Sequence, residues 1–265
     1  MAQTNGSSSI IALAGVPGTG KSYVATQAAI ELTGHELLVK TVQFHPGFSY
    51  EDFIEGYRPV AGGFELQDGV LLQVNQQARR DPQNKYVLLI EEFTRANIAA
   101  VLGELLTFIE YRNQPFVLPS GRQIALASNL VFIVTYNPLD RSALDLDDAV
   151  IRRLRIKNIP PDAQLLDSMI SPTTNLEEVF KESLVRNFSE LCKYGAEGDS
   201  ISLPFGHAVF KDITEIGELQ ALWDQQIKFL VKRPSLPPHP LADEVYRMIR
   251  LVADDVSKFK MQEGE

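Results

Sequence analysis

The sequence predicts an α/β protein, with a three-layer α/β/α domain built on a parallel sheet and then a small helical domain. Three observations lead to this prediction. Short apolar runs alternate with helical patterns, as they do where helices cover both faces of a parallel sheet. A glycine-rich turn joins the first apolar run to the first helical pattern. After Pro160-Pro161 no further buried-strand pattern appears, so we expect residues 1–160 to form the α/β domain and 161–265 the helical one.

Five segments have the composition of strands. The first, third and fourth are apolar runs, which are typical of strands covered on both faces of a sheet, and the second is a further strand candidate. The last alternates apolar and basic residues, so we expect it at an edge of the sheet. In chain order the strands are Ser8–Leu13, Leu37–Phe44, Tyr86–Ile90, Leu130–Thr135 and Leu154–Ile159.

Helical periodicity fills the gaps between these strands and most of the region beyond them. Two hairpins are also expected, one turning at Ala61-Gly62-Gly63 and one pairing Pro115–Leu118 with Gln123–Leu126. The expected helices of the first domain are Lys21–Leu32, Val70–Arg80, Ile98–Tyr111 and Asp147–Arg153. Those of the second are Ala163–Met169, Leu176–Cys192, Glu215–Val231 and Ala242–Lys258.

Composition excludes several classes of protein. The only cysteine, Cys192, cannot form an internal disulfide, and we expect it to be a small buried residue. A net charge of -9 argues against a broad DNA-binding surface, so we expect DNA contact only indirectly. No apolar run reaches the roughly 18 residues that span a bilayer. Residues 1–9 lack a signal-peptide pattern, so we expect a cytoplasmic protein with no membrane partner.

The glycine-rich turn, Gly15–Ser22, fits the pattern G-x-x-x-x-G-K-[ST]. Glycines let the backbone curl so that several N–H groups converge on phosphate oxygens. The helix that starts there directs its positive end at the same oxygens. Lys21 adds a full charge on the β- and γ-phosphates, and the Ser22 hydroxyl is a ligand for Mg²⁺. The segment therefore predicts a nucleoside triphosphate site, with expected contacts from Gly15, Pro17, Gly18, Thr19, Gly20, Lys21, Ser22 and Tyr23.

Two carboxylates follow the third strand. We expect Glu91 to hold the Mg²⁺ shell and Glu92 to orient and deprotonate the attacking water. The alternative is an exposed acidic pair that caps the next helix. Asn137 follows the fourth strand, whose carboxyl end faces the same site in a parallel sheet. Its amide is expected to contact the γ-phosphate and the water, and the alternative is a turn-forming asparagine before Pro138.

Arg152 and Arg153 end the last helix expected in the first domain. An arginine can neutralise charge that develops during phosphoryl transfer. Taken alone, however, composition favours surface arginines near a helix C-terminus, where the helix dipole stabilises them.

In this order, these landmarks resemble the AAA+ superfamily of ring-forming NTPases, in particular the McrB type, with MoxR-type ATPases as broader relatives. Four segments carry the resemblance. They are Gln43–Pro59, Glu92-Phe-Thr-Arg95-Ala-Asn97, Asn137-Pro-Leu-Asp140-Arg141-Ser142 and Phe205-Gly-His207-Ala-Val-Phe210.

The resemblance implies a ring, by analogy hexameric, in which Arg152 and Arg153 act on the neighbouring subunit and Asp140 lies beside the nucleotide. It also implies an effector partner such as a McrC-like nuclease. McrB-type proteins place a DNA-recognition domain before the motor, whereas only residues 1–7 precede the first strand here. We therefore expect recognition and cutting to lie on other chains.

Three departures from the family pattern limit what carries over. Glu91 stands where the family has Asp, Thr94 where it has Asn, and Pro138-Leu139 where it has Thr-Ala. We expect ATP as the nucleotide, with GTP as the alternative, and Mg²⁺ as the metal. Three functions stay open: a motor for a nuclease or other effector, a MoxR-like remodelling chaperone, and a nucleotide-gated assembly module with little turnover. The sensor arginine of the second domain is open among Arg233, Arg247 and Arg250.

Overall fold

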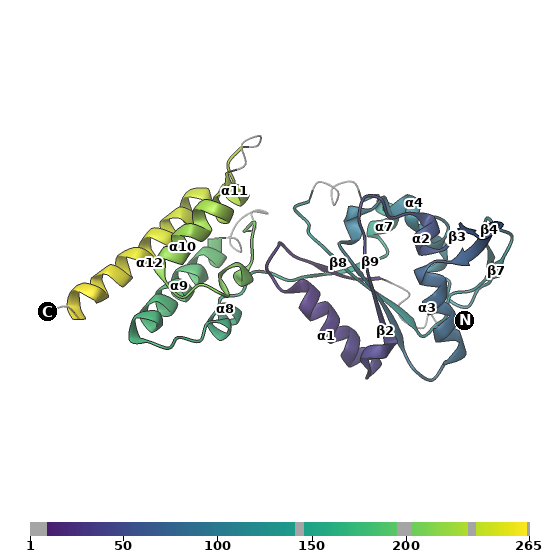
Figure 1. The fold of residues 1–265 in the computed structure, drawn as a ribbon, viewed down its shortest axis with the longest axis horizontal. Coiled ribbons are helices and arrows are strands. Elements are labelled where there is room, and N and C mark those ends of the chain that lie inside the picture. The colour runs from purple at the N-terminus through teal and green to yellow at the C-terminus, as the bar shows by residue number, and fades with distance from the viewer. Residues whose placement is uncertain (1–9, 141–145, 195–202, 233–236, 264–265) are drawn as a thin grey trace. The chain divides into compact units, whose positions relative to one another are not determined.

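The structure, a computed structural model, describes residues 10–140, 146–194, 203–232 and 237–263 (Figure 1). The chain divides into two compact units. One comprises Met1–Gly15 and Lys21–Asn158, and the other comprises Val16–Gly20 and Ile159–Glu265. The second unit is therefore discontinuous, because it takes a short piece of the glycine-rich turn as well as the helical region.

The first unit is built on a five-stranded parallel sheet with the order β2-β5-β8-β1-β9. This confirms the predicted fold class, including the edge position of the last strand. The strands are β1 Ile10–Ala14, β2 Val39–Gln43, β5 Tyr86–Glu91, β8 Leu130–Tyr136 and β9 Leu154–Asn158.

Both faces of the central strands are buried, which explains their continuous apolar runs. Leu88 and Ile90 of β5 belong to the large core cluster that includes Leu71 of α3 (Val70–Arg80). Val87 and Leu89 alternate with them, point to the opposite face and are fully buried. Helix α1 (Lys21–Thr33) also packs on β5 and β8, and Figure 1 draws α1 and α3 on opposite sides of the sheet.

One expected helix was wrong. Residues 98–111 do not form one helix but two short ones, α4 (Ile98–Leu102) and α5 (Leu105–Phe108). The break lies at Gly103, whose φ of +49° is a backbone conformation that glycine adopts without steric cost. The helix expected over residues 147–153 is also shorter, because α7 spans only Asp148–Ile151 and ends before the two arginines.

Both expected hairpins are present. The first pairs β3 (Glu55–Val60) with β4 (Gly63–Asp68), directly after the short helix α2 (Tyr50–Phe53). The second pairs β6 (Phe116–Val117) with β7 (Gln123–Ile124). Arg122 of the second hairpin bonds Glu55 and Asp68 at the base of the first, so one side chain joins the two hairpins.

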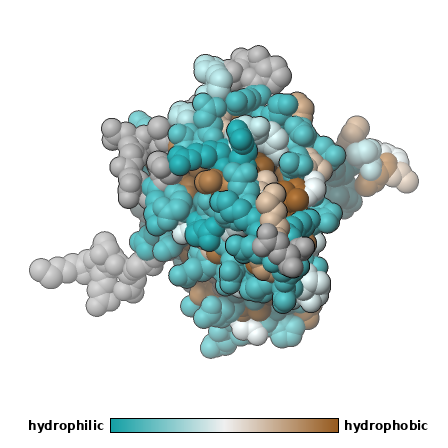
Figure 2. All heavy atoms as spheres, turned by 90° about the vertical axis from the view of Figure 1, so that its left-hand side faces the viewer, coloured by the Kyte–Doolittle hydropathy of each residue, from teal (hydrophilic) through white to brown (hydrophobic). Residues whose placement is uncertain are grey.

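The second unit is helical apart from its piece of the glycine-rich turn. Its helices are α8 (Ala163–Met169), α9 (Asn175–Tyr194), α10 (Ile216–Leu222), α11 (Lys228–Val231) and α12 (Ala242–Glu263). A π-helical turn, Trp223–Ile227, connects α10 to α11, and Trp223 is buried. Figure 2, which faces the side where Figure 1 draws this unit, shows a mostly hydrophilic surface with small separate hydrophobic areas.

Among the described residues, no helix combines the length and the apolar character needed to cross a bilayer. Cys192 on α9 is half-buried rather than fully buried. Burial, together with the charge of Asp162, raises the pKa of its thiol to about 11.

Candidate functional site

The glycine-rich turn connects the end of β1 to the start of α1. Gly18 and Gly20 have φ values of +81° and +75°, which side chains other than glycine rarely allow. A Cβ placed on Gly20 would meet no atom within 4 Å, so the space on that side of the loop is open. The Thr19 hydroxyl donates to the carbonyl of Val16 at 3.0 Å, which braces the loop from inside. The loop therefore has the curled backbone and the free space that a phosphate group needs.

The first residues of α1 continue the site. Lys21 is the first residue of the helix and is only 8% exposed, whereas Ser22 and Tyr23 are exposed. Before the loop, the amide of Gly15 donates to the carbonyl of Tyr136 at 3.1 Å. Because Asn137 comes next in the chain, the start of the loop lies beside the end of β8.

Residues 205–208 brace the loop within the second unit. The amide of Gly206 donates to Pro17 O at 2.8 Å, and the amide of Ala208 donates to Gly18 O at 2.9 Å. A Cβ on Gly206 would lie 2.3 Å from the carbonyl carbon and oxygen of Gly18, which no structure tolerates without movement. The sequence contained this segment only as a family resemblance, and its contact with the loop was not anticipated.

His207, beside Gly206, is 1% exposed. Its Nδ1 accepts a hydrogen bond from the amide of Asp162 at 3.1 Å, so in the neutral ring Nε2 carries the proton. Burial lowers the pKa of this imidazole, which favours the neutral form. Nε2 has no hydrogen-bond partner among the described residues, so the ring is hydrogen-bonded on one side only.

Both predicted acidic residues lie at the carboxyl end of β5. Glu91 is the last residue of the strand, and Glu92 follows it with φ +53° and ψ +41°. This left-handed turn changes the direction of the chain between the two residues, and both side chains stay partly exposed. Since a non-glycine residue in this conformation is uncommon and such strain concentrates at functional sites, the turn supports a special role for Glu92.

An aromatic cluster supports that turn. Phe93, directly after Glu92, is fully buried and stacks with Phe44 at a ring-centroid distance of 5.9 Å. Phe44 also contacts Phe48 at 4.6 Å and Phe53 at 5.5 Å. The stretch Gln43–Pro59 thus anchors the loop that carries Glu92, which gives this most specific part of the resemblance a packing role.

Asn137 lies at the end of β8 and is 8% exposed. Its side-chain Oδ1 accepts a hydrogen bond from the backbone amide of Leu139 at 3.0 Å. This oxygen therefore takes part in a turn, as the turn-forming alternative expects. Its Nδ2 donates to Asp140 Oδ1 at 2.9 Å. Asp140 in turn pairs with Arg95 at 3.5 Å, and Arg95 Nε pairs with Glu92 at 3.3 Å. The structure thus links Asn137 and Asp140 to Glu92 through Arg95, a residue of the resemblance segment Glu92–Asn97 to which the sequence assigned no role.

The two arginines separate. Arg153 is 4% exposed, and its guanidinium bonds the carbonyl of Ala149 at 2.6 Å and the carboxylate of Glu110 at 3.4 Å. Arg152 is exposed, and no ion pair of this side chain occurs among the described residues. Arg153 is therefore held inside its own subunit, and of the two only Arg152 is available to a neighbour.

Thr94, which replaces the asparagine of the family pattern, is buried, and its hydroxyl has no hydrogen-bond partner among the described residues. It borders a cavity of about 400 Å³ that Pro46, Ala96, Asn97 and Val150 also line. No hydrogen bond joins the Thr94 side chain to Glu92 within the described part of the chain, whereas Arg95 forms an ion pair with Glu92.

These residues fit a nucleotide with Mg²⁺. Proteins usually hold Mg²⁺ through one or two side-chain oxygens, with substrate phosphates and water completing the shell. Ser22 at the start of α1 and Glu91 at the end of β5 can supply such oxygens. Within the described ranges no group of three or more His, Cys, Asp or Glu side chains could hold a metal ion by itself.

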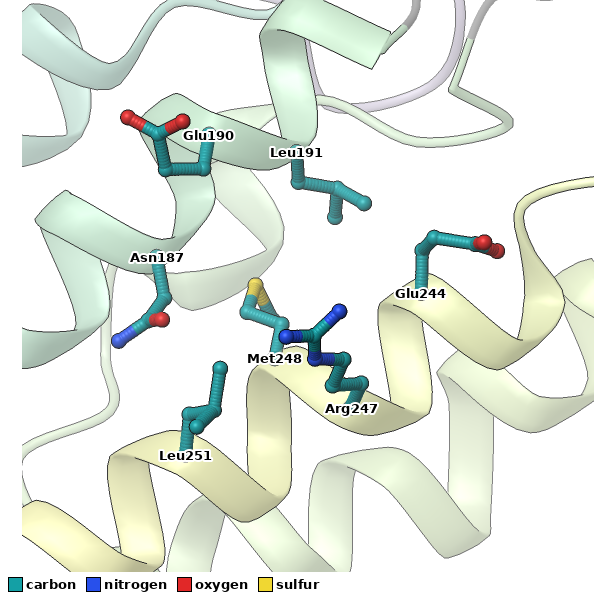
Figure 3. A pocket seen from close by; sticks show the side chains of 7 residues that line it. All are labelled: Asn187, Glu190, Leu191, Glu244, Arg247, Met248 and Leu251. Carbon is teal, nitrogen blue, oxygen red and sulfur yellow. The ribbon is translucent and has the colours of Figure 1, made fainter.

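Sensor candidates in the helical region stay open. Figure 3 shows Arg247 and Met248 of α12 facing Leu191 of α9 around a hollow of about 240 Å³. Arg250 is exposed on the same helix. Arg233 lies outside the described residues, as do Arg141 and Ser142 of the resemblance.

The sequence of the chain is similar to that of several known proteins. Residues 10–154 match the family model described as AAA domain (dynein-related subfamily). Over 194 residues the chain is 36% identical to the "Type IV methyl-directed restriction enzyme EcoKMcrB subunit" of Escherichia coli strain K12, covering 68% of this chain and 42% of that protein. Over 184 residues it is 27% identical to the "Type II restriction enzyme BsuMI component YdiS" of Bacillus subtilis strain 168, covering 52% of this chain and 53% of that one.

The chain thus spans about half, or less, of the length of these two relatives. Among solved structures, a candidate ATPase from Cytophaga hutchinsonii is similar at 14% identity and a TM-score of 0.41, covering 94% of this chain and 85% of that one.

Proposed function

Because the chain belongs to the AAA domain family, in its dynein-related subfamily, we propose that it is a ring-forming nucleoside triphosphatase that drives a nuclease or other effector partner. The observation that carries the proposal is the arrangement at one edge of the sheet. The phosphate loop follows β1, Asn137 follows its neighbour β8, and the two carboxylates end the next strand, β5. Since the carboxyl ends of parallel strands meet at one edge, these groups can act on one substrate.

The proposed reaction is hydrolysis of the β–γ phosphoanhydride. The loop amides and Lys21 hold the phosphates, and Ser22 and Glu91 would hold Mg²⁺, which would neutralise phosphate charge. Glu92 accepts a proton from a water whose oxygen attacks the γ-phosphorus, and the bond to the β-phosphate oxygen breaks. The products are a nucleoside diphosphate and inorganic phosphate. Asn137 contacts the γ-phosphate or the water.

Assembly and partner follow from the relatives. The match to the McrB subunit supports a ring, by analogy hexameric, a McrC-like nuclease as effector, and a role in restriction or phage defence inside the cytoplasm. In such a ring Arg152 reaches the neighbouring subunit's nucleotide. ATP is the proposed substrate and GTP the alternative, because Pro138-Leu139 changes the loop on which the family's nucleotide preference depends. A MoxR-like chaperone would share the same site and differ in its partner.

Steady-state phosphate release with ATP and with GTP tests the proposal. Glu92→Gln is expected to abolish turnover and leave nucleotide affinity unchanged, because it removes the base without touching the phosphate loop. Glu31→Gln, an exposed glutamate of α1, is the matched control and should hydrolyse like the unchanged protein. Turnover that survives Glu92→Gln would exclude this role for Glu92.

A nucleotide-gated assembly module is the second candidate. Glu91 in place of aspartate, together with the buried, unpaired hydroxyl of Thr94, favours it, since both depart from the family's catalytic pattern. This candidate predicts equal, near-zero rates for the unchanged protein and for Glu92→Gln, while both still bind nucleotide and assemble.

A further inference from the structure

We propose that Arg95 is a positioning residue that couples the general base Glu92 to Asn137 through Asp140. The inference rests on the proposed function, because it assigns Arg95 a role in that hydrolysis. It was not part of the motif pattern of phosphate loop, acidic pair, asparagine and arginines.

Continuous contacts carry the inference. Arg95 Nε lies 3.3 Å from Glu92 Oε2, and Arg95 Nη2 lies 3.5 Å from Asp140 Oδ2. The other oxygen of Asp140 accepts from Asn137 Nδ2 at 2.9 Å. One guanidinium therefore bridges two carboxylates, Glu92 after the end of β5 and Asp140 after the end of β8.

Arg95 does not serve the core or the stability of the fold. Its side chain is 53% exposed, and those of Glu92 and Asp140 are 29% and 26% exposed. Exposed ion pairs of this kind contribute little to stability, about 0–1 kcal/mol. The guanidinium has a fixed, planar fork of donors, which suits it to hold two carboxylates at a set separation.

Local geometry gives this fork a defined position. Arg95 ends the 3₁₀ turn Phe93–Arg95, whose first residue is buried in the aromatic cluster, and its amide donates to Glu92 O at 2.8 Å. Both the turn and β8 are thus fixed, and Arg95 joins the side chains that project from them. Since Glu92 and Asn137 are proposed to act on the same water, a fixed separation between them is what catalysis needs.

The experiment compares kcat and nucleotide affinity. Arg95→Ala is expected to lower kcat about tenfold or more, because even a displacement of about 1 Å at a reacting group can cost about a hundredfold. The dissociation constant for nucleotide should stay within about threefold, because among the described residues Arg95 bonds Glu92 and Asp140 and not the phosphate loop. Arg95→Lys should recover part of kcat, since its ammonium can pair with one carboxylate but has no fork to bridge two. Arg80→Ala, an exposed arginine at the end of α3, is the control.

A double-mutant cycle tests the link through Asp140. Arg95→Ala combined with Asp140→Asn should be no slower than the slower single variant, because both changes break one chain of contacts. Losses that multiply independently, or a kcat for Arg95→Ala within twofold of the unchanged protein or above it, would overturn the inference. Glu92→Gln, measured alongside, distinguishes a failure of the inference about Arg95 from a failure of the proposed hydrolysis. If Glu92→Gln abolishes turnover, a contrary result in the double-mutant cycle counts against the role of Arg95 and not against hydrolysis.

Discussion

At the scale of single residues, Arg122 neutralises two carboxylates that the first hairpin places opposite one another. Glu55 and Asp68 are cross-strand partners of β3 and β4, and like charges in that relation repel. Arg122 Nη1 lies 2.5 Å from Asp68 and 3.1 Å from Glu55. Glu55 is 4% exposed, and Arg122 is the cation that pairs with it in this buried position.

Arg122→Ala should therefore lower the free energy of unfolding by about 2 kcal/mol, because it leaves a buried carboxylate unpaired. The value is below that of a fully buried pair since Arg122 itself is partly exposed. Urea unfolding measures the change. Adding Glu55→Gln should restore about half of the loss, whereas simple additivity of the two substitutions would contradict this account.

The type and spacing of the residues were enough to predict the glycine-rich loop as a candidate site. Gly18, Gly20 and Lys21 stand where the motif needs them, and the left-handed or buried conformations found there agree with it. The burial of Arg153 and the bridge made by Arg95 could not be read in the same way. Both depend on partners far along the chain, Glu110 and Asp140, which only the folded sheet brings near.

At the scale of elements, the turn that contains Gly206 packs directly against the glycine-rich loop. Gly206 and Ala208 bond two successive carbonyls of the loop, and the close approach leaves no room for a side chain. Local periodicity predicted where individual helices and strands lie, and α3 and α8 have the predicted bounds. The break at Gly103 did not, because the periodic pattern continues across it.

Gly206→Ala is expected to weaken nucleotide binding about tenfold, because the added Cβ must displace the Gly18 backbone by about 1 Å and so misplace the loop amides. Titration with nucleotide measures the effect. Gly217→Ala is the matched control. Its Cβ would meet only a flexible side-chain atom at 3.6 Å, and alanine inside α10 should add up to about 1 kcal/mol of stability without changing affinity. Equal affinities for both variants would show that the loop does not depend on this contact.

At the scale of the whole molecule, the proposed ring requires each nucleotide to be served by two subunits. Arg152 is exposed directly after α7, whereas Arg153 is engaged within its own subunit. Sequence alone grouped the two arginines, because no pattern distinguishes a side chain that turns inward from one that turns outward.

Mixing Arg152→Ala subunits with Glu92→Gln subunits should restore part of the activity that each variant lacks alone. Interfaces that combine an intact arginine with an intact Glu92 then form, and phosphate release measures them. Arg153→Ala should lower the melting temperature instead, because it leaves a hole and breaks the bond to Glu110. Mixed assemblies that stay inactive would place the action of Arg152 within its own subunit.

The split of the second unit into Val16–Gly20 and Ile159–Glu265 has a consequence for how such proteins can recombine. A graft that exchanged only residues 159–265 with those of a relative would set a foreign turn against the resident loop, with Gly206 and Gly18 no longer matched. A working chimera must inherit both segments from the same parent. Five residues of the glycine-rich loop, Val16–Gly20, therefore have to be exchanged together with the helical region when a chimera is designed.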